Sequence, residues 1–225
     1  MIGIIGAMDS EIESIKNKMT GVKEKTISNM SFYTGKLKNV DVVLAKCFEG
    51  KVNASVCTQT MILKFNPKSI INIGVAGAIS DKLNIGGIAV SSSTVEFDFD
   101  TTALGYDIGY VFGLDTVYMK CDEKISSIVF DLLEEKENVV TGVIASSDKF
   151  LSEKEDKDYL KENFDDIIAV DMESASICHV CNLNNIPYCA IRAISDTADN
   201  IEFREFLNIA TEKLDNIIMS VIDKI

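Results

Sequence analysis

The sequence predicts an α/β fold, a sandwich in which helices cover a largely buried sheet. Strand-like and helix-like segments alternate through the second half of the chain, as they do in βα units. Several strand-like segments, such as 69–73, are short continuous apolar runs, which is typical of strands buried on both faces. The length of 225 residues suits one such domain, so we expect residues 1–225 to form a single domain.

The first half of the chain is expected to contain five strands and two helices. The strands are apolar or β-branched segments at 2–6, 31–37, 40–46, 69–73 and 87–100. The helices, with apolar residues on one face, are expected at 9–19 and 51–63. Strand 69–73 is followed by Gly74-Val-Ala-Gly77, where we expect the backbone to turn tightly. The aromatic segment 101–118 is expected to be a loop.

The second half alternates more clearly. Helices are expected at 122–136, 153–163, 173–183 and 202–222, and strands at 138–146, 167–171 and 187–194. In folds of this class ligands bind at the carboxyl ends of strands. The segments just past expected strands are Met8–Glu11, Gly74–Gly77, Ser147–Leu151, Asp171–Glu173 and Ser195–Asp196.

Charge and composition limit the partners and the chemistry. The net charge is −13 and no basic patch is visible, so we expect neither a nucleic-acid nor a membrane partner. Arg192 and Arg204 are the only arginines and His179 is the only histidine. Catalysis is therefore expected to depend mainly on carboxylates. Six cysteines in apolar contexts, with no expected leader or membrane span, favour a reducing compartment, and we expect a cytoplasmic protein.

Three familiar motifs are incomplete. Gly3-Ile-Ile-Gly6 lacks the spacing of a dinucleotide-binding loop, and Gly50-Lys51 lacks the remainder of a P-loop. Cys178-His-Val-Cys181 lies in an expected helix without a second ligand pair, so a structural role is favoured over a metal site. His179 is likewise favoured as a packed residue.

Carboxylates at strand ends are the remaining candidates. Glu11 is also explained as a first-turn acid favoured by the helix dipole, and Glu173 as part of a helix N-terminus. Asp196 directly ends an apolar strand that contains Arg192, a costly placement unless the charge is used, although a turn or capping role is also open. None of these residues decides the function alone.

Together they resemble a known family. The segments GIIGAMDSE (3–11), SDKFL (147–151), VDMESASICHVC (170–181) and RAISDTAD (192–199) are similar, in order and spacing, to the 5′-methylthioadenosine/S-adenosylhomocysteine nucleosidases of the nucleoside phosphorylase superfamily. The resemblance implies a three-layer α/β/α sandwich with a mixed, partly barrel-like central sheet. It also implies hydrolysis of the N-glycosidic bond of 5′-methylthioadenosine or S-adenosylhomocysteine, with 5′-deoxyadenosine a further candidate, and no metal or cofactor.

The resemblance assigns three catalytic roles. Asp196 is expected to protonate adenine N7, and burial at a strand end can raise the pKa of a carboxyl as such an acid requires. Glu11 is expected to position and deprotonate the attacking water. Glu173 is expected to hold the ribose hydroxyls, its charge also favouring a cationic transition state.

The resemblance further implies a set of residues that bind substrate. For the base and the ribose they are Met8, Phe150, Leu151, Met172, Arg192, Ser195 and Phe203. Phe150 is expected to stack on adenine, Ser195 to orient Asp196, and Arg192 to lie near the water and Glu173.

Departures from the family pattern concentrate where the 5′ group is expected to bind. Val75 replaces a serine near the water, and Glu49 replaces an apolar residue facing the 5′ group. Leu104 and Phe112 replace a phenylalanine and a proline, while Tyr106 is retained. Residues 101–113 are expected to complete the site of the neighbouring chain in a homodimer. We expect adenine and ribose recognition to be kept and the 5′ preference to be shifted.

Alternatives remain open at this stage. The chain could act on adenosine, 5′-deoxyadenosine or an aminofutalosine-type nucleoside instead. A phosphorylase is disfavoured because the arginines that hold phosphate are scarce. A non-catalytic nucleoside-binding protein on the same fold is the alternative of a different class. Pathway context, such as methionine salvage, is not fixed by the sequence.

Overall fold

The computed structural model describes residues 1–135, 137–198 and 203–225, with the side chains of 203–209 left undescribed. The strands are β1 (Ile2–Gly6), β2 (Thr20–Ile27), β3 (Met30–Leu37), β4 (Val40–Lys46), β5 (Ser69–Ala78), β6 (Ile88–Glu96), β7 (Met119–Lys120), β8 (Val139–Ser146), β9 (Ile167–Asp171) and β10 (Tyr188–Asp196). The helices are α1 (Asp9–Lys18), α2 (Lys51–Phe65), α3 (Glu123–Leu133), α4 (Lys154–Asn163), α5 (Ser174–Leu183) and α6 (Phe203–Val221), with a 3-10 turn at Thr102–Leu104.

One mixed sheet runs through the molecule and closes on itself at one end. Strand β5 pairs in parallel with β10 and, near its carboxyl end, antiparallel with β9. Because β10, β6, β8 and β9 are also paired in that order, these strands and β5 close into a small barrel. Strands β1, β4, β3 and β2 extend the sheet from the amino-terminal part of β5, on the edge opposite β10. The expected mixed, partly barrel-like sheet is confirmed.

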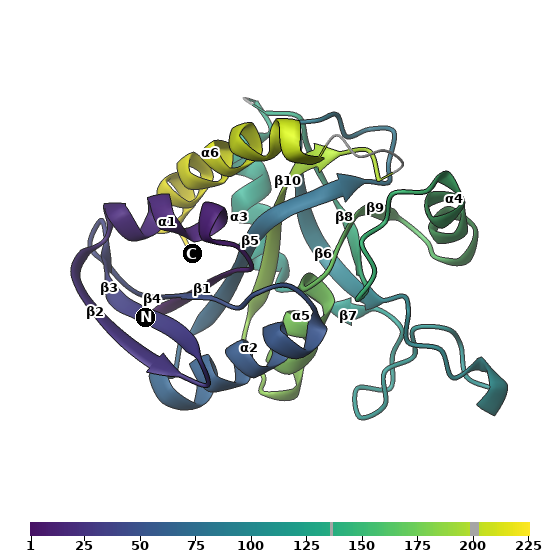
Figure 1. Ribbon diagram of the computed structural model, residues 1–225, viewed down its shortest axis with the longest axis horizontal. Coiled ribbons are helices and arrows are strands. Elements are labelled where there is room, and N and C mark those ends of the chain that lie inside the picture. Colours follow the sequence, from purple (N-terminus) through teal and green to yellow (C-terminus); the bar gives the residue numbers. More distant parts are fainter. Residues whose placement is uncertain (136, 199–202) are drawn as a thin grey trace.

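Helices cover both faces of this sheet (Figure 1). Helices α1, α3 and α6 lie on one face and α2 and α5 on the other, which confirms the three layers. Strand β1 shows why its sequence is a continuous apolar run. Ile4 packs in the core beneath α1 and α6, and the next residue, Ile5, packs in the core beneath α2 and α5. Since successive strand residues point to opposite faces, a strand between two helical layers needs both to be apolar.

The expected turn at Gly74–Gly77 is wrong. Strand β5 continues without a break to Ala78, paired along its length with β10, which itself runs on to Asp196. Its glycines serve close packing instead of a turn. A Cβ on Gly74 would overlap the guanidinium of Arg192, and one on Gly77 would lie 2.8 Å from a carboxylate oxygen of Asp196. The glycines therefore leave room for charged side chains beside the strand.

The other expected helices and strands are confirmed to within a few residues, except that two strands were not expected. Strand β2 pairs only with β3 at the edge of the sheet, and most of its side chains are exposed. Strand β7 has two residues. Residues 136 and 202, at the ends of two expected helices, lie outside the described residues. Across the described part of the chain, no helix combines the length and apolar character needed to span a membrane.

Candidate active site

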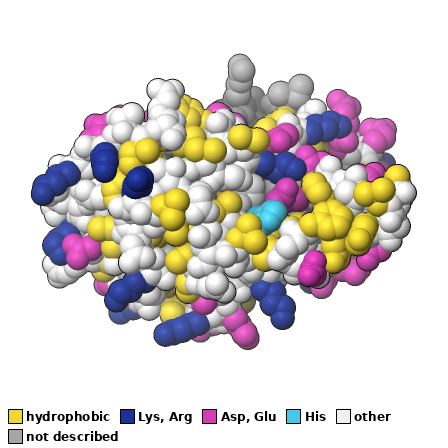
Figure 2. All heavy atoms as spheres, turned by 90° about the horizontal axis from the view of Figure 1, so that it is seen from below, with side chains coloured by type: hydrophobic (Ala, Val, Ile, Leu, Met, Phe, Trp, Pro, Cys, Tyr) yellow, Lys and Arg dark blue, Asp and Glu magenta, His cyan; other side chains and the backbone are white. Residues whose placement is uncertain are grey.

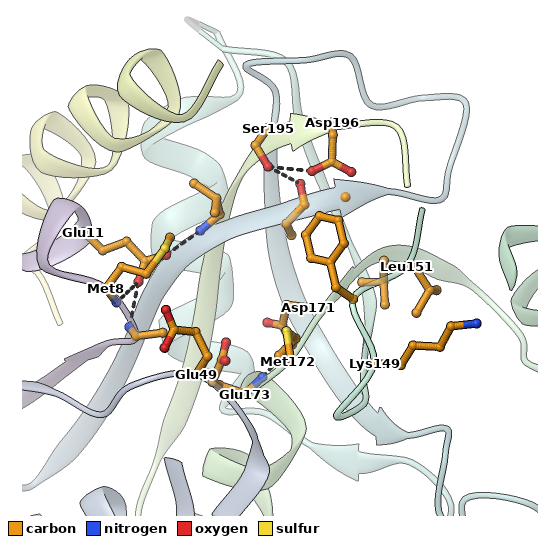
Figure 3. Close-up of a pocket in the computed structure, with 16 residues that line it drawn as sticks. Met8, Glu11, Glu49, Lys149, Leu151, Asp171, Met172, Glu173, Ser195 and Asp196 are labelled. Carbon is orange, nitrogen blue, oxygen red and sulfur yellow. Dashed lines mark hydrogen bonds between the residues drawn. The ribbon is translucent and has the colours of Figure 1, made fainter. Parts of the chain in front are cut away.

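A cavity opens at the carboxyl ends of strands β1, β5, β9 and β10 (Figure 3). Its volume of about 210 Å³ suits one small molecule, being somewhat below the ~300–1,000 Å³ usual for ligand pockets. It brings together segments from the whole chain. The lining residues are Ala7, Met8, Glu11, Glu49, Val75, Ala76, Gly77, Lys149, Phe150, Leu151, Val170, Asp171, Met172, Glu173, Ser195 and Asp196.

Glu11 lies on the first turn of α1 and is 2% exposed. Its Oε2 accepts hydrogen bonds from the backbone N–H groups of Ala7 (2.6 Å) and Met8 (3.0 Å), and its Oε1 accepts from Val75 N–H (3.0 Å). Burial raises the pKa of Glu11, and the nearby Arg192 charge and the three backbone donors oppose that rise. The helix start therefore fixes a carboxyl in the cavity wall with an increased affinity for protons.

Glu173 is the residue that precedes α5, and it is 5% exposed. Its Oε1 accepts a hydrogen bond from Gly50 N–H at 2.9 Å, so the segment before α2 holds it in place. Burial and, next, the charge of Asp171 raise the pKa of Glu173 to about 8, while Arg192 and Gly50 N–H oppose the rise. The surroundings of Glu173 thus favour its protonated form near neutral pH.

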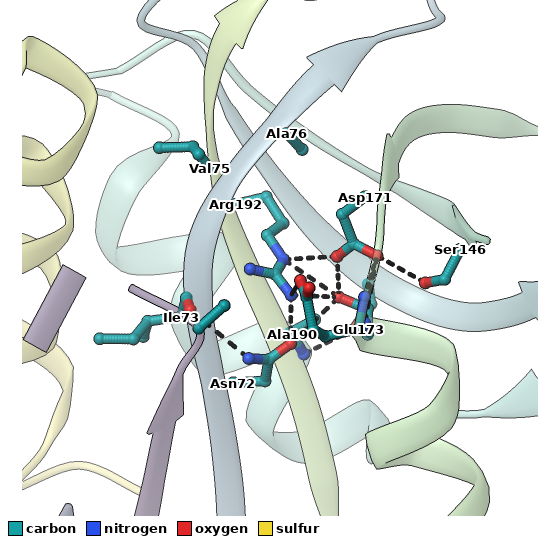
Figure 4. Close-up of polar contacts among 12 residues, drawn as sticks. Asn72, Ile73, Val75, Ala76, Ser146, Asp171, Glu173, Ala190 and Arg192 are labelled. Atoms are coloured by element: carbon teal, nitrogen blue, oxygen red, sulfur yellow. Dashed lines mark hydrogen bonds and ion pairs between the residues drawn. The ribbon is translucent and has the colours of Figure 1, made fainter. Parts of the chain in front are cut away.

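Arg192 lies behind the cavity wall, where it forms a buried ion pair with Asp171 (Figure 4). Its Nε is 2.7 Å from Asp171 Oδ2, and its Nη2 is 4.0 Å from Glu173 Oε2. The expected proximity of Arg192 to Glu173 is thus observed. The pKa of Arg192 is raised, because the charges of Asp171, Glu173 and Glu11 outweigh the opposing effect of its complete burial.

Polar residues that sequence reasoning did not select hold this ion pair. Asn72 Oδ1 accepts a hydrogen bond from Arg192 Nη2, and Ser174 Oγ accepts one from Arg192 Nε at 3.0 Å. Ser146 and Ser174 both donate to Asp171. An asparagine inside the apolar run SIINI is the one sequence signal that marks this network, because a buried amide needs partners.

Asp196 is the last residue of β10 and is 3% exposed. Its Oδ2 accepts a hydrogen bond from Ser195 Oγ at 2.8 Å, and its Oδ1 accepts one from Ala198 N–H at 2.9 Å. Gly77 on β5 leaves space for this carboxylate. The expected pairing of Ser195 with Asp196 is therefore present, and both residues line the cavity.

Of the residues expected around base and ribose, most line the cavity. Leu151 is buried, Met8 and Met172 are half-buried, and Phe150 is about half-exposed. Val75 also lines the cavity and contributes its backbone N–H to Glu11. The side chain of Phe203, expected to close the pocket, lies outside the described residues.

The residues expected around the 5′ group lie in two different parts of the structure. Glu49 lines the cavity, whereas Leu104, Tyr106 and Phe112 are exposed on the 101–118 loop and do not line it. On that loop Tyr106 stacks on Tyr110, with ring centroids 5.1 Å apart, and meets the edge of Phe112 at 4.8 Å. Figure 2, which shows the molecule from below, has exposed hydrophobic side chains gathered at its right.

His179 and the nearby cysteines have structural surroundings. His179 Nδ1 lies 2.9 Å from Glu96 Oε1, and Lys51 Nζ lies 3.3 Å from the other oxygen of Glu96. Burial tends to raise the pKa of Glu96, but His179 and Lys51 outweigh it and lower that pKa. Cys178 and Cys181 are buried thiols. Among the described residues, no group of histidines, cysteines and carboxylates is placed to hold a metal ion.

The geometry supports acid–base chemistry on a small organic ligand. Two acids with raised pKa values, Glu11 and Glu173, share a cavity with the buried carboxyl of Asp196. Such groups can hold or transfer protons near neutral pH. The cavity wall is also acidic, which favours a ligand that develops positive charge.

Comparisons with known proteins agree with the geometry. A sequence profile described as the phosphorylase superfamily matches residues 1–223. A 5′-methylthioadenosine/S-adenosylhomocysteine nucleosidase of Staphylococcus haemolyticus is 36% identical over 225 residues, covering 99% of each chain. The crystal structure of the nucleosidase of that name from Neisseria meningitidis, in complex with methylthio-immucillin-A, is 32% identical with a TM-score of 0.96, covering 100% and 99% of the two chains. Futalosine hydrolase of Helicobacter pylori is 31% identical with a TM-score of 0.93, covering 100% and 97%.

Proposed function

This chain belongs to the phosphorylase superfamily, and from that premise we propose that it hydrolyses the N-glycosidic bond of 5′-methylthioadenosine and S-adenosylhomocysteine. The products are adenine and the 5′-substituted ribose, and 5′-deoxyadenosine is a further candidate substrate. The observation that carries the proposal is the convergence of Glu11, Glu173 and Asp196 on one cavity, from three distant parts of a chain that its nucleosidase relatives match along nearly its whole length. No cofactor takes part in the proposed reaction.

In the proposed mechanism, Asp196 donates its proton to N7 of adenine as the N-glycosidic bond breaks. The bond's electron pair leaves with the base, so positive charge develops on the ribosyl group. Glu11 accepts a proton from the water that attacks C1′. Glu173 binds the ribose hydroxyls. Burial favours its protonated form, and the developing cation favours its ionised form.

Water suits this cavity better than phosphate as the molecule that attacks C1′. A phosphorylase site needs cationic groups aimed at the phosphate. Among the described residues that line the cavity, Lys149 is the only basic one, and its Nζ pairs with Asp156 at 2.6 Å. Arg192 lies behind the wall, bound to Asp171.

A related nucleosidase with a different 5′ preference is the second candidate. The structure is similar to futalosine hydrolase at almost the same TM-score as to the methylthioadenosine nucleosidase, and this similarity supports the second candidate. Both candidate functions are compatible with this fold. The groups facing the 5′ substituent therefore decide between them.

The proposal extends to the assembly and the compartment. The exposed cluster of Tyr106, Tyr110 and Phe112 supports a homodimer in which residues 101–113 complete the neighbouring cavity. Six unpaired cysteines support the reducing environment of the cytoplasm. Sedimentation analysis at micromolar concentration tests the dimer.

Adenine release from four nucleosides tests the proposed reaction. The substrates are 5′-methylthioadenosine, S-adenosylhomocysteine, 5′-deoxyadenosine and adenosine, each with and without phosphate. Release that does not depend on phosphate supports the hydrolase, and the substrate ranking separates the two nucleosidase candidates. Release only in the presence of phosphate contradicts it.

A further inference from the structure

The cavity has two distinct ends. Ser195 and Asp196 lie at one end, and Glu49 lies at the other, next to Glu173 (Figure 3). Under the proposed function, on which this inference rests, the base occupies the Asp196 end and the ribose lies against Glu173. The substituent at the 5′ position therefore extends toward Glu49.

The backbone on both sides of Glu49 is firmly held. Cys47 N–H donates to Gly6 O at 2.9 Å, and Gly50 N–H donates to Glu173 Oε1 at 2.9 Å. The carbonyl of Glu49 itself accepts from Asn53 Nδ2 at 2.9 Å. Phe48, just before it, has a φ of 64°, an uncommon conformation for a non-glycine residue that surrounding contacts must maintain. The segment thus holds the backbone of Glu49 in a defined position, and its side chain lines the cavity.

The carboxylate of Glu49 differs from the other acids of the cavity. Glu11, Asp171, Glu173 and Asp196 all accept hydrogen bonds from protein groups. The Glu49 carboxylate has no hydrogen bond or ion pair to any residue in the part of the chain that the structure describes, and it is exposed. Its charge is therefore free to act on a ligand.

The lysine of the cavity lining and the two lysines closest to Glu49 in the sequence are already paired. Lys149 Nζ lies 2.6 Å from Asp156. Lys51 Nζ lies 2.6 Å from Asp98, and Lys46 Nζ lies 2.7 Å from Asp9. The end of the cavity at Glu49 consequently carries an uncompensated negative charge.

We infer that Glu49 is a specificity-determining residue that favours nucleosides whose 5′ substituent ends in a cationic amino group. The same charge opposes 5′ substituents that end in a carboxylate or a phosphate. A neutral alkylthio group gains nothing from it. For a substituent that carries both an ammonium and a carboxylate, attraction of the first and repulsion of the second partly cancel.

Three adenine nucleosides of matched 5′ length separate charge from size. Their 5′ sulfur carries a 3-aminopropyl, a butyl or a 3-carboxypropyl group, and kcat/KM for adenine release is measured for each. For the wild-type protein we expect the amino compound to exceed the butyl compound by about two- to fivefold, and the carboxy compound to fall below it by a similar factor, as for one exposed charge pair. Added salt should shrink both ratios.

The Glu49→Gln variant is the decisive comparison, because it removes the charge and keeps the size. Both ratios should approach one in this variant. In Glu123→Gln, which removes an exposed acid outside the cavity lining, they should remain as in the wild type. Ratios that are the same in Glu49→Gln and in the wild type overturn the inference while leaving the proposed hydrolase intact. Release of adenine from none of the three compounds overturns both.

Discussion

Arg192 Nε lies 2.7 Å from Asp171 Oδ2, and both side chains are almost completely buried. The pair joins the carboxyl end of β9 to the middle of β10, immediately behind the acidic cavity. Its cation is the charge that opposes the high proton affinity of Glu11 and Glu173. The arginine is therefore expected to support the site from behind, through charge and position.

Replacing Arg192 tests this support. Arg192→Met leaves Asp171 buried without its partner, and we expect a loss of about 3–5 kcal/mol in the free energy of unfolding. Urea unfolding at neutral pH measures it. The double variant Arg192→Met, Asp171→Asn should recover part of the loss, since no unpaired charge remains. A loss below about 1 kcal/mol in the single variant would contradict a structural ion pair.

The pH dependence of stability tests the environment of Glu173. Burial raises its pKa to about 8, so the folded protein holds a proton that the unfolded chain has released above about pH 4.5. The folded state binds more protons in this window, and its stability therefore falls as the pH rises from about 5 to 8.

Glu173→Gln removes this titration. We expect its free energy of unfolding to fall less steeply with pH over the same range. The slope should be smaller than that of the wild type by up to about 1.4 kcal/mol for each pH unit. Urea unfolding of the ligand-free protein at several pH values compares the slopes. Glu162→Gln, an exposed acid on α4, is the control and should keep the wild-type slope. Equal slopes in Glu173→Gln and the wild type would show that the pKa of Glu173 is not raised in the folded protein.

The close approach at Gly77 gives a prediction about activity. A Cβ at this position would lie 2.8 Å from Asp196 Oδ1 and 2.8 Å from the Cβ of Ala198. Gly77→Ala should displace the carboxylate and lower kcat by at least about tenfold, because small misplacements of a catalytic group are costly.

Gly142→Ala is the matched control for that variant. Its Cβ would also collide, with Ile168 at 2.5 Å, but it lies outside the cavity lining. We expect a loss of thermal stability with little change in kcat at a temperature where the protein stays folded. If both variants reduce kcat equally, the effect of Gly77→Ala is not specific to Asp196.

Ser195 is expected to position Asp196. Its hydroxyl donates to Asp196 Oδ2 at 2.8 Å, while Ala198 N–H holds the other oxygen. Ser195→Ala should lower kcat about fivefold with little change in KM, since one neutral hydrogen bond is worth about 1 kcal/mol. Ser195→Thr, which retains the hydroxyl, should recover most of kcat. A change confined to KM would instead place Ser195 in ground-state binding.

Much of the fold follows from the sequence because its elements are locally consistent. Helices and strands with clear apolar patterns, such as α3 and β1, were predicted within a few residues. Strand β2 was missed because its TGVKEKTI sequence is polar and its side chains are mostly exposed, so edge pairing with β3 determines its structure. The turn expected at Gly74 was wrong because tertiary packing against Arg192 requires a glycine there.

The site was predictable in part, for a different reason. Family resemblance indicated Glu11, Glu173 and Asp196, and the structure places all three in one cavity. The partners that hold them could not be read from the sequence. Gly50 acts through a backbone N–H, and Asn72 contacts Arg192 across 120 positions of the chain. The Gly50 contact leaves no local pattern, and Asn72 is marked only by its place inside the apolar run SIINI.

Adenine release from 5′-methylthioadenosine in phosphate-free buffer, by the wild type and by Asp196→Asn, tests the central claim most directly. We predict steady release by the wild type and a loss of at least about a hundredfold in the variant, because an amide cannot supply the proton to the leaving base. Unfolding curves of the two proteins establish that the variant is folded. Equal release by a folded Asp196→Asn protein, or no release by the wild type, would contradict the account.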